Sequence, residues 1–215
     1  MKTAAHSFPR PAQPAVPKLS LREEQKAVTR RRIQDAAREL FYVNGYASTT
    51  IEQIALSAGT RRSTLYLHFH DKEDILRLIA VDYGVQLSAV IGTLSGPAPS
   101  RREIDAWILG VAEFVGSARM PTVLLSSLGN LADIPEPVRL LGDQLLSRLA
   151  VNHPAFRYAI EPGPRQPLAF AWASVALREL CWVCLLGAEP QEATLQQSFF
   201  SVVGDVMEKF LSDFA

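Results

Sequence analysis

Apolar residues recur at helical spacing along most of the chain, and the strongest run lies near the N-terminus. Ile33, Ala36, Ala37, Leu40 and Phe41 occupy positions i, i+3, i+4, i+7 and i+8. Because an α-helix repeats every 3.6 residues, this spacing places all five side chains on one face. The pattern therefore predicts a long amphipathic helix whose apolar stripe faces a core.

Residues with capping chemistry mark both ends of this helix. Ser20 lies three residues before Glu23, the spacing of a capping box, in which two side chains satisfy exposed backbone N–H groups of the first turn. Asn44 and Gly45 follow the apolar run and tolerate the left-handed conformation that ends many helices. The first helix is therefore expected to run from about residue 20 to residue 44.

A second, shorter apolar stripe follows. Ile51, Ile54, Ala55 and Ala58 fall at i, i+3, i+4 and i+7. Gly59 then breaks the pattern, at a point where a sharp change of direction needs a residue that accepts positive φ. The pattern predicts a short helix that ends in a tight turn.

This short helix has two alternative caps. Thr49 with Glu52, and Thr50 with Gln53, both have the spacing of a capping box. The sequence does not choose between them.

The residues after the turn combine one apolar face with several polar side chains. Thr60 can cap a further short helix, in which Leu65 and Phe69 form an i, i+4 apolar pair. The other faces carry residues of types that reach phosphates and base edges, namely Arg61, Arg62, Ser63, Tyr66 and His68. Two short helices joined by a tight turn indicate a helix-turn-helix.

The remainder of the chain also has a helical pattern, and alternating runs with β-turn signals are absent. Asp71 is expected to cap a helix that reaches about Leu94. Further helices are expected over residues 101–118, 121–131, 136–150, 166–186 and 191–214. The predicted fold class is all-α, with a three-helix N-terminal head that contains the helix-turn-helix and a C-terminal helical body.

Two of the predicted body helices are unusually apolar. The helix over residues 168–186 has apolar residues on every face, and the last helix has an apolar stripe too broad for its own core alone. Two such helices from each of two copies would form a four-helix bundle about a two-fold axis. We therefore expect a homodimer. The candidate interface residues are Trp182, Leu195, Phe199, Val203, Val206 and Phe210.

Charge is distributed unevenly although the formal net charge is zero. Residues 1–80 hold 13 Lys and Arg against 8 Asp and Glu, whereas residues 81–215 hold 9 against 14. A basic head suits a polyanion, so the overall neutrality does not exclude nucleic acid. We expect a disordered arm over residues 1–19, a DNA-binding domain over 20–70, and a dimerisation and effector domain over 71–215.

The number of cysteines and the apolar segments indicate the cellular compartment in which the protein is expected. The two cysteines, Cys181 and Cys184, are too few for a secreted disulfide framework and fit a reducing cytoplasm. Residues 1–17 contain four prolines and lack the apolar core of an export signal. Residues 168–186 are long enough to span a bilayer, but Arg178 and Glu179 lie near the middle, which favours a buried helix. The sequence predicts a cytoplasmic protein without membrane segments.

The run from Arg30 to Leu76 closely resembles the N-terminal DNA-binding domain of the TetR family of bacterial transcriptional regulators. The matching elements are the Ile33 to Phe41 stripe, Gly45-Tyr46, Thr49-Thr50, Ile54-Ala55, Ala58-Gly59, Thr64-Leu65-Tyr66, His68-Phe69 and Lys72-Glu73. The resemblance covers about residues 28–80, and the body matches no subgroup.

The resemblance implies roles for individual residues. Arg61, Arg62 and Ser63 would lie nearest to bases in the major groove. Phosphate contacts would come from Thr49, Thr50, Tyr66, His68 and Lys72, and Thr64 is a further candidate. Apart from the resemblance, the cluster of Arg30, Arg31 and Arg32 fits either a solvated helix end or phosphate contacts by one or two of them, with Arg30 the candidate. Thr60 stands where the family usually has Val and Ser63 where it often has Gly, so Thr60 is expected to be a cap or a phosphate ligand.

Arginine chemistry supports the same division. An Arg can donate two hydrogen bonds to one guanine, and such a pair discriminates by about 1–3 kcal/mol. Adjacent residues on a helix point about 100° apart, so Arg61 and Arg62 are not expected to read bases equally. Arg62 is the preferred base reader because the family often has a basic residue there. A two-fold dimer would bind a palindrome with half-sites roughly 34 Å apart or a multiple of that distance.

The resemblance also implies a small-molecule effector bound in the body. The candidate pocket residues are Trp107, Phe114, Leu124, Leu128, Phe156, Phe170 and Trp172. They predict a mainly apolar pocket. If the effector is an anion, the candidate ligands are Arg119, Arg139, Arg148 and Arg178. His153 precedes Pro154 and is expected to be exposed in a loop.

Other functions have weaker support. The alternative to a regulator is a helical-bundle enzyme or a carrier of hydrophobic ligands. The sequence argues against it, because no nucleophile with a base, paired carboxylates within one motif or phosphate-binding glycine loop occurs. Cys181 and Cys184 form a CxxC, but a metal site generally needs four ligands, and no second CxxC or His pair accompanies them. We expect no metal and no cofactor, and a thiol-switched regulator stays a further alternative.

Overall fold

The computed structural model describes residues 20–94, 96, 98–129, 134–185 and 190–214, which form helices and contain no strand. The helices are α1 Leu21–Asn44, α2 Ile51–Ser57, α3 Arg62–Tyr66, α4 Lys72–Ile91, α5 Arg101–Ser117, α6 Arg119–Gly129, α7 Glu136–Asn152, α8 Pro154–Ile160, α9 Gln166–Val183 and α10 Pro190–Asp213. The all-α prediction is confirmed. The predicted arm over residues 1–19 lies outside the described residues.

The first helix begins and ends at the predicted residues. Ser20 caps α1, and its side chain and that of Glu23 form the complete capping box. Gly45 follows the last helical residue with a φ of 79°, a conformation that costs a residue without a Cβ little. One face of α1 is buried through Ile33, Ala37 and Phe41.

The structure decides between the two caps of α2. The side chain of Thr50 accepts a hydrogen bond from the backbone N–H of Gln53, and the Gln53 side chain accepts one from the N–H of Thr50. Gly59 makes the following turn with a φ of 64°. Thr60 does not cap α3, because the helix begins one residue later, and its cap, Arg61, makes no side-chain capping bond.

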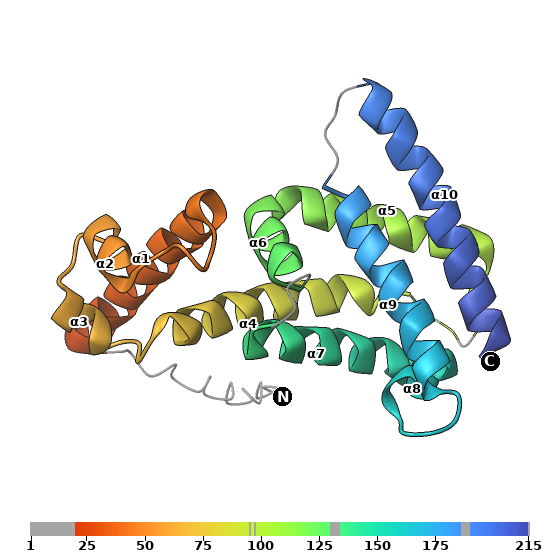
Figure 1. Ribbon diagram of the computed structural model, residues 1–215, viewed down its shortest axis with the longest axis horizontal. Helices are drawn as coiled ribbons and strands as arrows, with labels where there is room; N and C mark the ends of the chain where they lie inside the picture. Colours follow the sequence, from red (N-terminus) through yellow and green to blue (C-terminus); the bar gives the residue numbers. More distant parts are fainter. Residues whose placement is uncertain (1–19, 95, 97, 130–133, 186–189, 215) are drawn as a thin grey trace, which may run out of the picture.

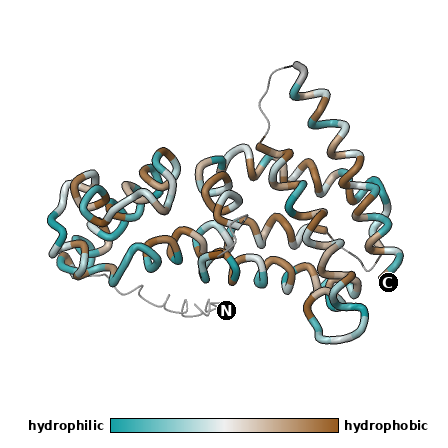
Figure 2. Tube along the Cα trace, viewed as in Figure 1, coloured by the Kyte–Doolittle hydropathy of each residue, from teal (hydrophilic) through white to brown (hydrophobic). Residues whose placement is uncertain are grey.

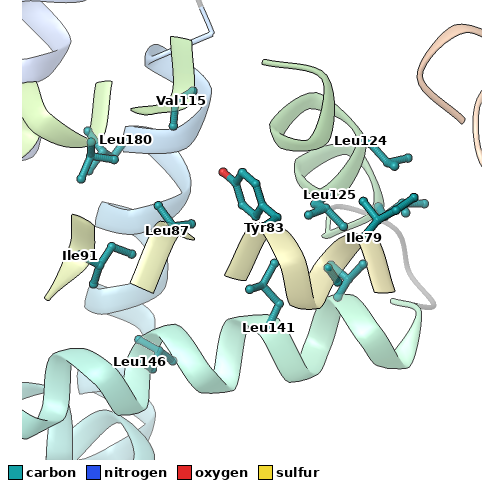
Figure 3. Close-up of a cluster of buried hydrophobic side chains, with 14 of the residues drawn as sticks. Ile79, Tyr83, Leu87, Ile91, Val115, Leu124, Leu125, Leu141, Leu146 and Leu180 are labelled. Carbon is teal, nitrogen blue, oxygen red and sulfur yellow. The ribbon is translucent and has the colours of Figure 1, made fainter. Parts of the chain in front are cut away.

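The fourth helix carries the chain from the head into the body (Figure 1). Asp71 caps it as predicted, with a side-chain oxygen 2.8 Å from the backbone N of Asp74. Figure 3 shows Ile79, Tyr83, Leu87 and Ile91 along α4 among buried side chains from α5, α6, α7 and α9. This helix is therefore shared between the core of the body and the connection to the head.

The body is a set of helices packed around α4. Helix α7 lies along α4, α8 packs against α7, α9 packs against α8, and α10 packs against α5 and α9 (Figure 1). Apolar residues recur along both α4 and α7 (Figure 2). The buried apolar side chains form one cluster that runs from Ile33 in the head to Phe214, directly after α10.

One short helix and one buried residue were not predicted. Helix α8 begins at Pro154, where a missing backbone N–H costs nothing. His153 caps neither helix with its side chain but is fully buried, and its Nε2 lies 3.0 Å from the carbonyl oxygen of Leu94. The prediction that His153 is exposed in a loop is wrong. No surface loop exists there, because α7 ends at Asn152 and α8 begins at Pro154.

Among the described residues, no single helix has the length and apolar composition needed to cross a membrane. The pair α5 and α6 meets that test jointly by length and composition, with a bend of 103° between the two helices.

Candidate nucleic-acid interface

Helix α3 is anchored by apolar side chains and presents polar ones to solvent. Leu65 and Phe69 are buried against α1 and α2, which fixes the orientation of the short helix. Arg61, Arg62 and Ser63 are exposed at its start. A helix held in this way offers its first turn to an external partner.

The two arginines of α3 differ in their contacts. The guanidinium of Arg62 lies 2.6 Å from the carboxylate of Glu52, 3.3 Å from the hydroxyl of Tyr66 and 5.5 Å from the centre of the Tyr66 ring. These contacts raise the pKa of Arg62, first through the Tyr66 hydrogen bond and then through the Glu52 charge. Arg61 has no ion-pair or hydrogen-bond partner for its side chain within the described residues.

Thr49 was predicted to bind phosphate, and the structure contradicts this role for its side chain. Thr49 is only 2% exposed, and its hydroxyl lies 2.8 Å from the carbonyl oxygen of Gly45 and 3.2 Å from that of Leu40. A buried hydroxyl that binds these carbonyls holds the end of α1. Thr50 is exposed beside it and keeps the predicted access to a phosphate.

Lys72 was also predicted to bind phosphate, but its ammonium group is engaged inside the head. Its Nζ donates to the carbonyl oxygens of Tyr46, Ala47 and Thr49 at 2.7, 3.2 and 3.0 Å. It also lies 4.4 Å from the centre of the Tyr46 ring. An ammonium has three donors, so all of its hydrogen bonds are used within the chain. The assignment to phosphate is therefore corrected to a clamp on the loop between α1 and α2.

Arg30 and His68 lie together on the side of the head where α1 meets the end of α3. A guanidinium nitrogen of Arg30 donates to the carbonyl oxygen of His68 at 3.1 Å, and the group lies 4.6 Å from the centre of the Phe69 ring. Burial and the charges of Lys26 and Arg30 lower the pKa of His68, so its ring is neutral at pH 7. Arg30 stays exposed and is held in place.

The remaining predicted residues of the turn differ in exposure. Tyr66 is exposed, whereas Thr60 and Thr64 are half-buried. The backbone N–H of Thr60 donates to the carbonyl oxygen of Ala55 at 2.9 Å, a bond that closes the end of α2. Thr60 is thus part of the turn through its backbone.

Sequence comparison identifies this head. Residues 33–79 match the model of the family described as bacterial regulatory proteins, tetR family. The segment belongs to the TetR family. The match spans α1 from Ile33, both helices of the helix-turn-helix, and the first part of α4.

Curated relatives align with the same TetR segment. The chain is 43% identical over 51 residues to the HTH-type transcriptional regulator SrpR of Pseudomonas putida, which covers 24% of each chain. It is 40% identical over 53 residues to the HTH-type transcriptional regulator AcrR of Shigella flexneri, which covers 25% of each chain. The similarity thus spans about a quarter of these relatives. Both are named as regulators, not as enzymes.

Solved structures extend the similarity of fold beyond the head. The crystal structure of Mycobacterium smegmatis AmtR is 27% identical, with a TM-score of 0.52, and the match covers 89% of this chain and 90% of that one. A TetR-like transcriptional regulator from Rhodococcus sp. RHA1 is 20% identical, with a TM-score of 0.58 over 82% and 94% of the two chains. The fold of the body is therefore also that of known regulators.

Of the residues predicted to form an effector pocket in the body, only Trp107 lines one of the two pockets found among the described residues. Phe156 is fully buried in the core, where its ring lies 5.0 Å from that of Phe210, whereas Phe170 is 45% exposed. Trp107 is buried and borders a small pocket of about 240 Å³ next to Leu94. The others are distributed over core positions (Leu124, Leu128) and half-buried positions (Phe114, Trp172). Aromatic residues here serve mainly to fill the core.

A larger groove of about 490 Å³ lies elsewhere, between α1, α4 and the start of α6. Its polar lining includes Arg38, Asp82, Gln86 and Arg119. Of these four residues, only Arg119 is among the anion ligands predicted from the sequence. The other three are ordinary polar residues on helix surfaces, so no sequence signal separates them from solvated positions.

The predicted dimer residues fall into two groups. Trp182 is 50% exposed and Leu195 is also exposed, and the Trp182 ring lies 5.7 Å from that of the half-buried Phe199. Val203 and Phe210, in contrast, are buried within the chain, so their assignment to an interface is wrong. They face α5 and α8 in the body core because the lower part of α10 packs there. Val206 is half-buried.

The two cysteines lie in the apolar surroundings of α9. Burial raises the pKa of Cys181 to about 11 and that of Cys184 to about 12. Because the thiolate is the reactive form, both thiols are protonated and unreactive at neutral pH. This environment gives no support to a thiol switch.

Proposed function

We propose that this protein is a ligand-responsive transcriptional regulator that binds a palindromic DNA operator as a homodimer. In this proposal it is a cytoplasmic repressor, and a small effector releases it from the operator. The observation that carries the proposal is the surface of α3, where arginines are exposed on a short helix whose apolar side is buried in a TetR-family head. The named regulators with the same head support it.

The difference between the two arginines bears on specificity. The sequence favours Arg62 as the base reader. In the free protein its guanidinium is paired with Glu52, so base contact requires this exposed pair to open or rearrange. Exposed pairs contribute only about 0–1 kcal/mol, and a bidentate guanine contact outweighs that cost. Arg61 has no such cost and suits a phosphate or groove contact.

The apolar surface on α9 and α10 supports the dimer. The first part of α10 extends beyond α5 and α9 (Figure 1), and it carries Leu195 and Phe199, with Trp182 of α9 beside them. Exposed aromatic and aliphatic residues that lie together are typical of interfaces between copies. A two-fold pairing here would relate the two α3 helices by the same axis, which matches the symmetry of a palindrome.

A mobility-shift assay on promoter fragments of the gene and its neighbours tests this function. Arg62→Ala is expected to weaken operator binding by about 1–3 kcal/mol, or roughly 5- to 150-fold, and to relax base preference. Arg139→Ala, on the exposed face of α7, is the matched control and should bind as the parent does. Failure of the parent to bind any fragment, or unchanged selectivity of Arg62→Ala, would contradict the function or the residue assignment, respectively.

A further inference from the structure

The groove between α1, α4 and α6 lies where the head meets the body. Arg38 reaches it from α1, Asp82, Tyr83 and Gln86 from α4, and Arg119 from the first turn of α6. Its volume of about 490 Å³ falls within the usual range of small-molecule sites. A molecule bound here would touch a helix of the DNA-binding head and a helix of the body at once.

The charges around the groove favour an anion. Arg119 has no ion-pair or hydrogen-bond partner for its side chain within the described residues, and the side chain of Arg38 is 28% exposed, with one exposed partner, Asp35, at 3.1 Å. The carboxylate of Asp82 already accepts a hydrogen bond from the Gln34 side chain. The groove lining therefore contains two guanidinium groups and one carboxylate, and that carboxylate already has a hydrogen-bond donor in the chain.

The floor of the groove is apolar. Ile79 and Tyr83 are buried on α4, and the exposed Met120, in the first turn of α6, also lines the groove. The hydroxyl of Tyr83 is hydrogen-bonded to that of Thr122 at 2.9 Å, so the Tyr83 ring faces the groove as an apolar surface with its polar end satisfied. A bound molecule would thus meet apolar atoms below and guanidinium groups at the rim.

We propose that this groove binds a small organic carboxylate with an apolar body. The carboxylate would pair with Arg119 and Arg38, because a guanidinium binds a carboxylate through two parallel hydrogen bonds. The apolar body would cover Tyr83 and Met120, and a hydroxyl on the ligand would face the Asp82 carboxylate.

This site also has a regulatory consequence, which rests on the proposed function. Because Arg38 belongs to α1 and Arg119 to α6, a ligand that binds both favours one spacing of the head relative to the body. A ligand shifts an equilibrium only by its difference in affinity for the two arrangements, so its effect on DNA binding is bounded by that difference. Typical couplings change affinity by roughly 5- to 150-fold.

Isothermal titration calorimetry with 1-naphthoate tests the site without DNA. We expect 1-naphthoate to bind one site per chain, and the neutral 1-naphthamide to bind roughly tenfold more weakly or not at all, since only the carboxylate pairs with guanidinium groups. Arg119→Ala should weaken 1-naphthoate binding by a similar factor. Ser117→Phe, which fills the groove from its edge, should abolish binding without a change of charge.

Arg102→Ala is the matched control, since Arg102 is also exposed but lies in the first turn of α5 and does not line the groove. It should bind 1-naphthoate as the parent does. Thermal unfolding of each variant separates loss of the site from loss of the fold. Absence of 1-naphthoate binding, equal binding of the amide, or parent-like binding by Arg119→Ala would overturn the proposal.

The DNA assay distinguishes this proposal from the proposed function. A chain that binds 1-naphthoate through Arg119 but binds no promoter fragment keeps the site and loses the function. A chain that binds its operator but not 1-naphthoate keeps the function and loses the site. When both hold, 1-naphthoate should change operator affinity in the parent and leave that of Ser117→Phe unchanged.

Discussion

Arg101 in the body and Arg61 in the head are cations in opposite surroundings. In the body, the guanidinium of Arg101 on α5 contacts the carboxylates of Asp105 and of Asp205 and Glu208 on α10, so it ties two helices together. In the head, Arg61 extends from the start of α3 without such a partner among the described residues. A cation that joins two helices must break its ion pairs within the chain before it can bind an external anion. An unpaired cation can bind such an anion directly. The position of a charge relative to the packed helices therefore separates stabilising cations from candidate ligand-binding ones.

Lys72 is the sharpest test of this comparison, because it lies in the head but is bound like a cation of the body. Replacing Lys72 by Met removes donors from three loop carbonyls, and we expect the free energy of unfolding to fall by about 1–3 kcal/mol. Chemical denaturation measures this. The salt dependence of operator binding should stay that of the parent, since all three donors of the ammonium bind carbonyls of the chain itself.

Lys26→Met is the control for this experiment, because Lys26 is exposed on α1. Its stability should stay within about 0.5 kcal/mol of the parent. A Lys72→Met protein of parental stability whose salt slope falls by about one would instead restore Lys72 as a phosphate ligand.

Arg101 tests the other side of the comparison. Arg101→Met removes the junction between α5 and α10, but the pairs are partly exposed, so we expect a loss of only about 1 kcal/mol. The neighbouring Arg102→Met, at an exposed position, should change stability by less than that. Urea unfolding of the two variants side by side checks the difference. Equal stability would mean that the network contributes nothing.

The two partly or fully buried histidines predict a pH dependence of stability. Burial lowers the pKa of both His68 and His153, and the charges of Lys26 and Arg30 add to this in the head. Below about pH 6.5 the unfolded chain therefore binds more protons than the folded one. Stability should fall as the pH drops through 6.5 and should become constant below the lowered values.

Thermal unfolding between pH 7.5 and pH 5 measures this effect. His153→Gln keeps a donor near the Leu94 carbonyl and removes the titrating group, so its melting temperature should depend less on pH than that of the parent. A variant with the full pH dependence would show that the body histidine is not responsible and would leave His68 as the source.

Arg61 gives the smallest expected change in stability. Because its side chain has no partner within the described residues, Arg61→Ala should leave the free energy of unfolding within about 0.5 kcal/mol of the parent. Operator affinity should nevertheless fall. A destabilisation as large as that of Lys72→Met would place Arg61 among the structural cations and remove the contrast between the two regions.

Local spacing predicted the head well because each of its helices has one buried side. Ser20, Glu23 and Gly45 mark the ends of α1 in a way that depends only on neighbouring residues. The choice between Thr49 and Thr50 as the cap of α2 could not be read locally, since it depends on the end of α1, where Thr49 binds carbonyls.

The body was less predictable because its helices cover one another. Phe156 and Phe170 look alike in sequence, yet one is in the core and the other on the surface, and the contacts of α8 and α10 decide between them. Arg38 and Asp82 are distant in sequence, and they line one groove only because α1 crosses α4 near α6. The spacing of apolar residues within each helix does not predict which helices cross.

The hydrogen bonds of Lys72 attach the head to the first residue of α4, so the head moves with that end of the helix. Lys72 is the first residue of this helix, and its three hydrogen bonds attach the helix end to the loop between α1 and α2. The helix has 20 residues and is therefore roughly 30 Å long. A tilt of about 10° at its far end displaces the attached head by roughly 5 Å over that length. Rearrangements of the body small enough to keep its core packed are thus magnified at the recognition helix.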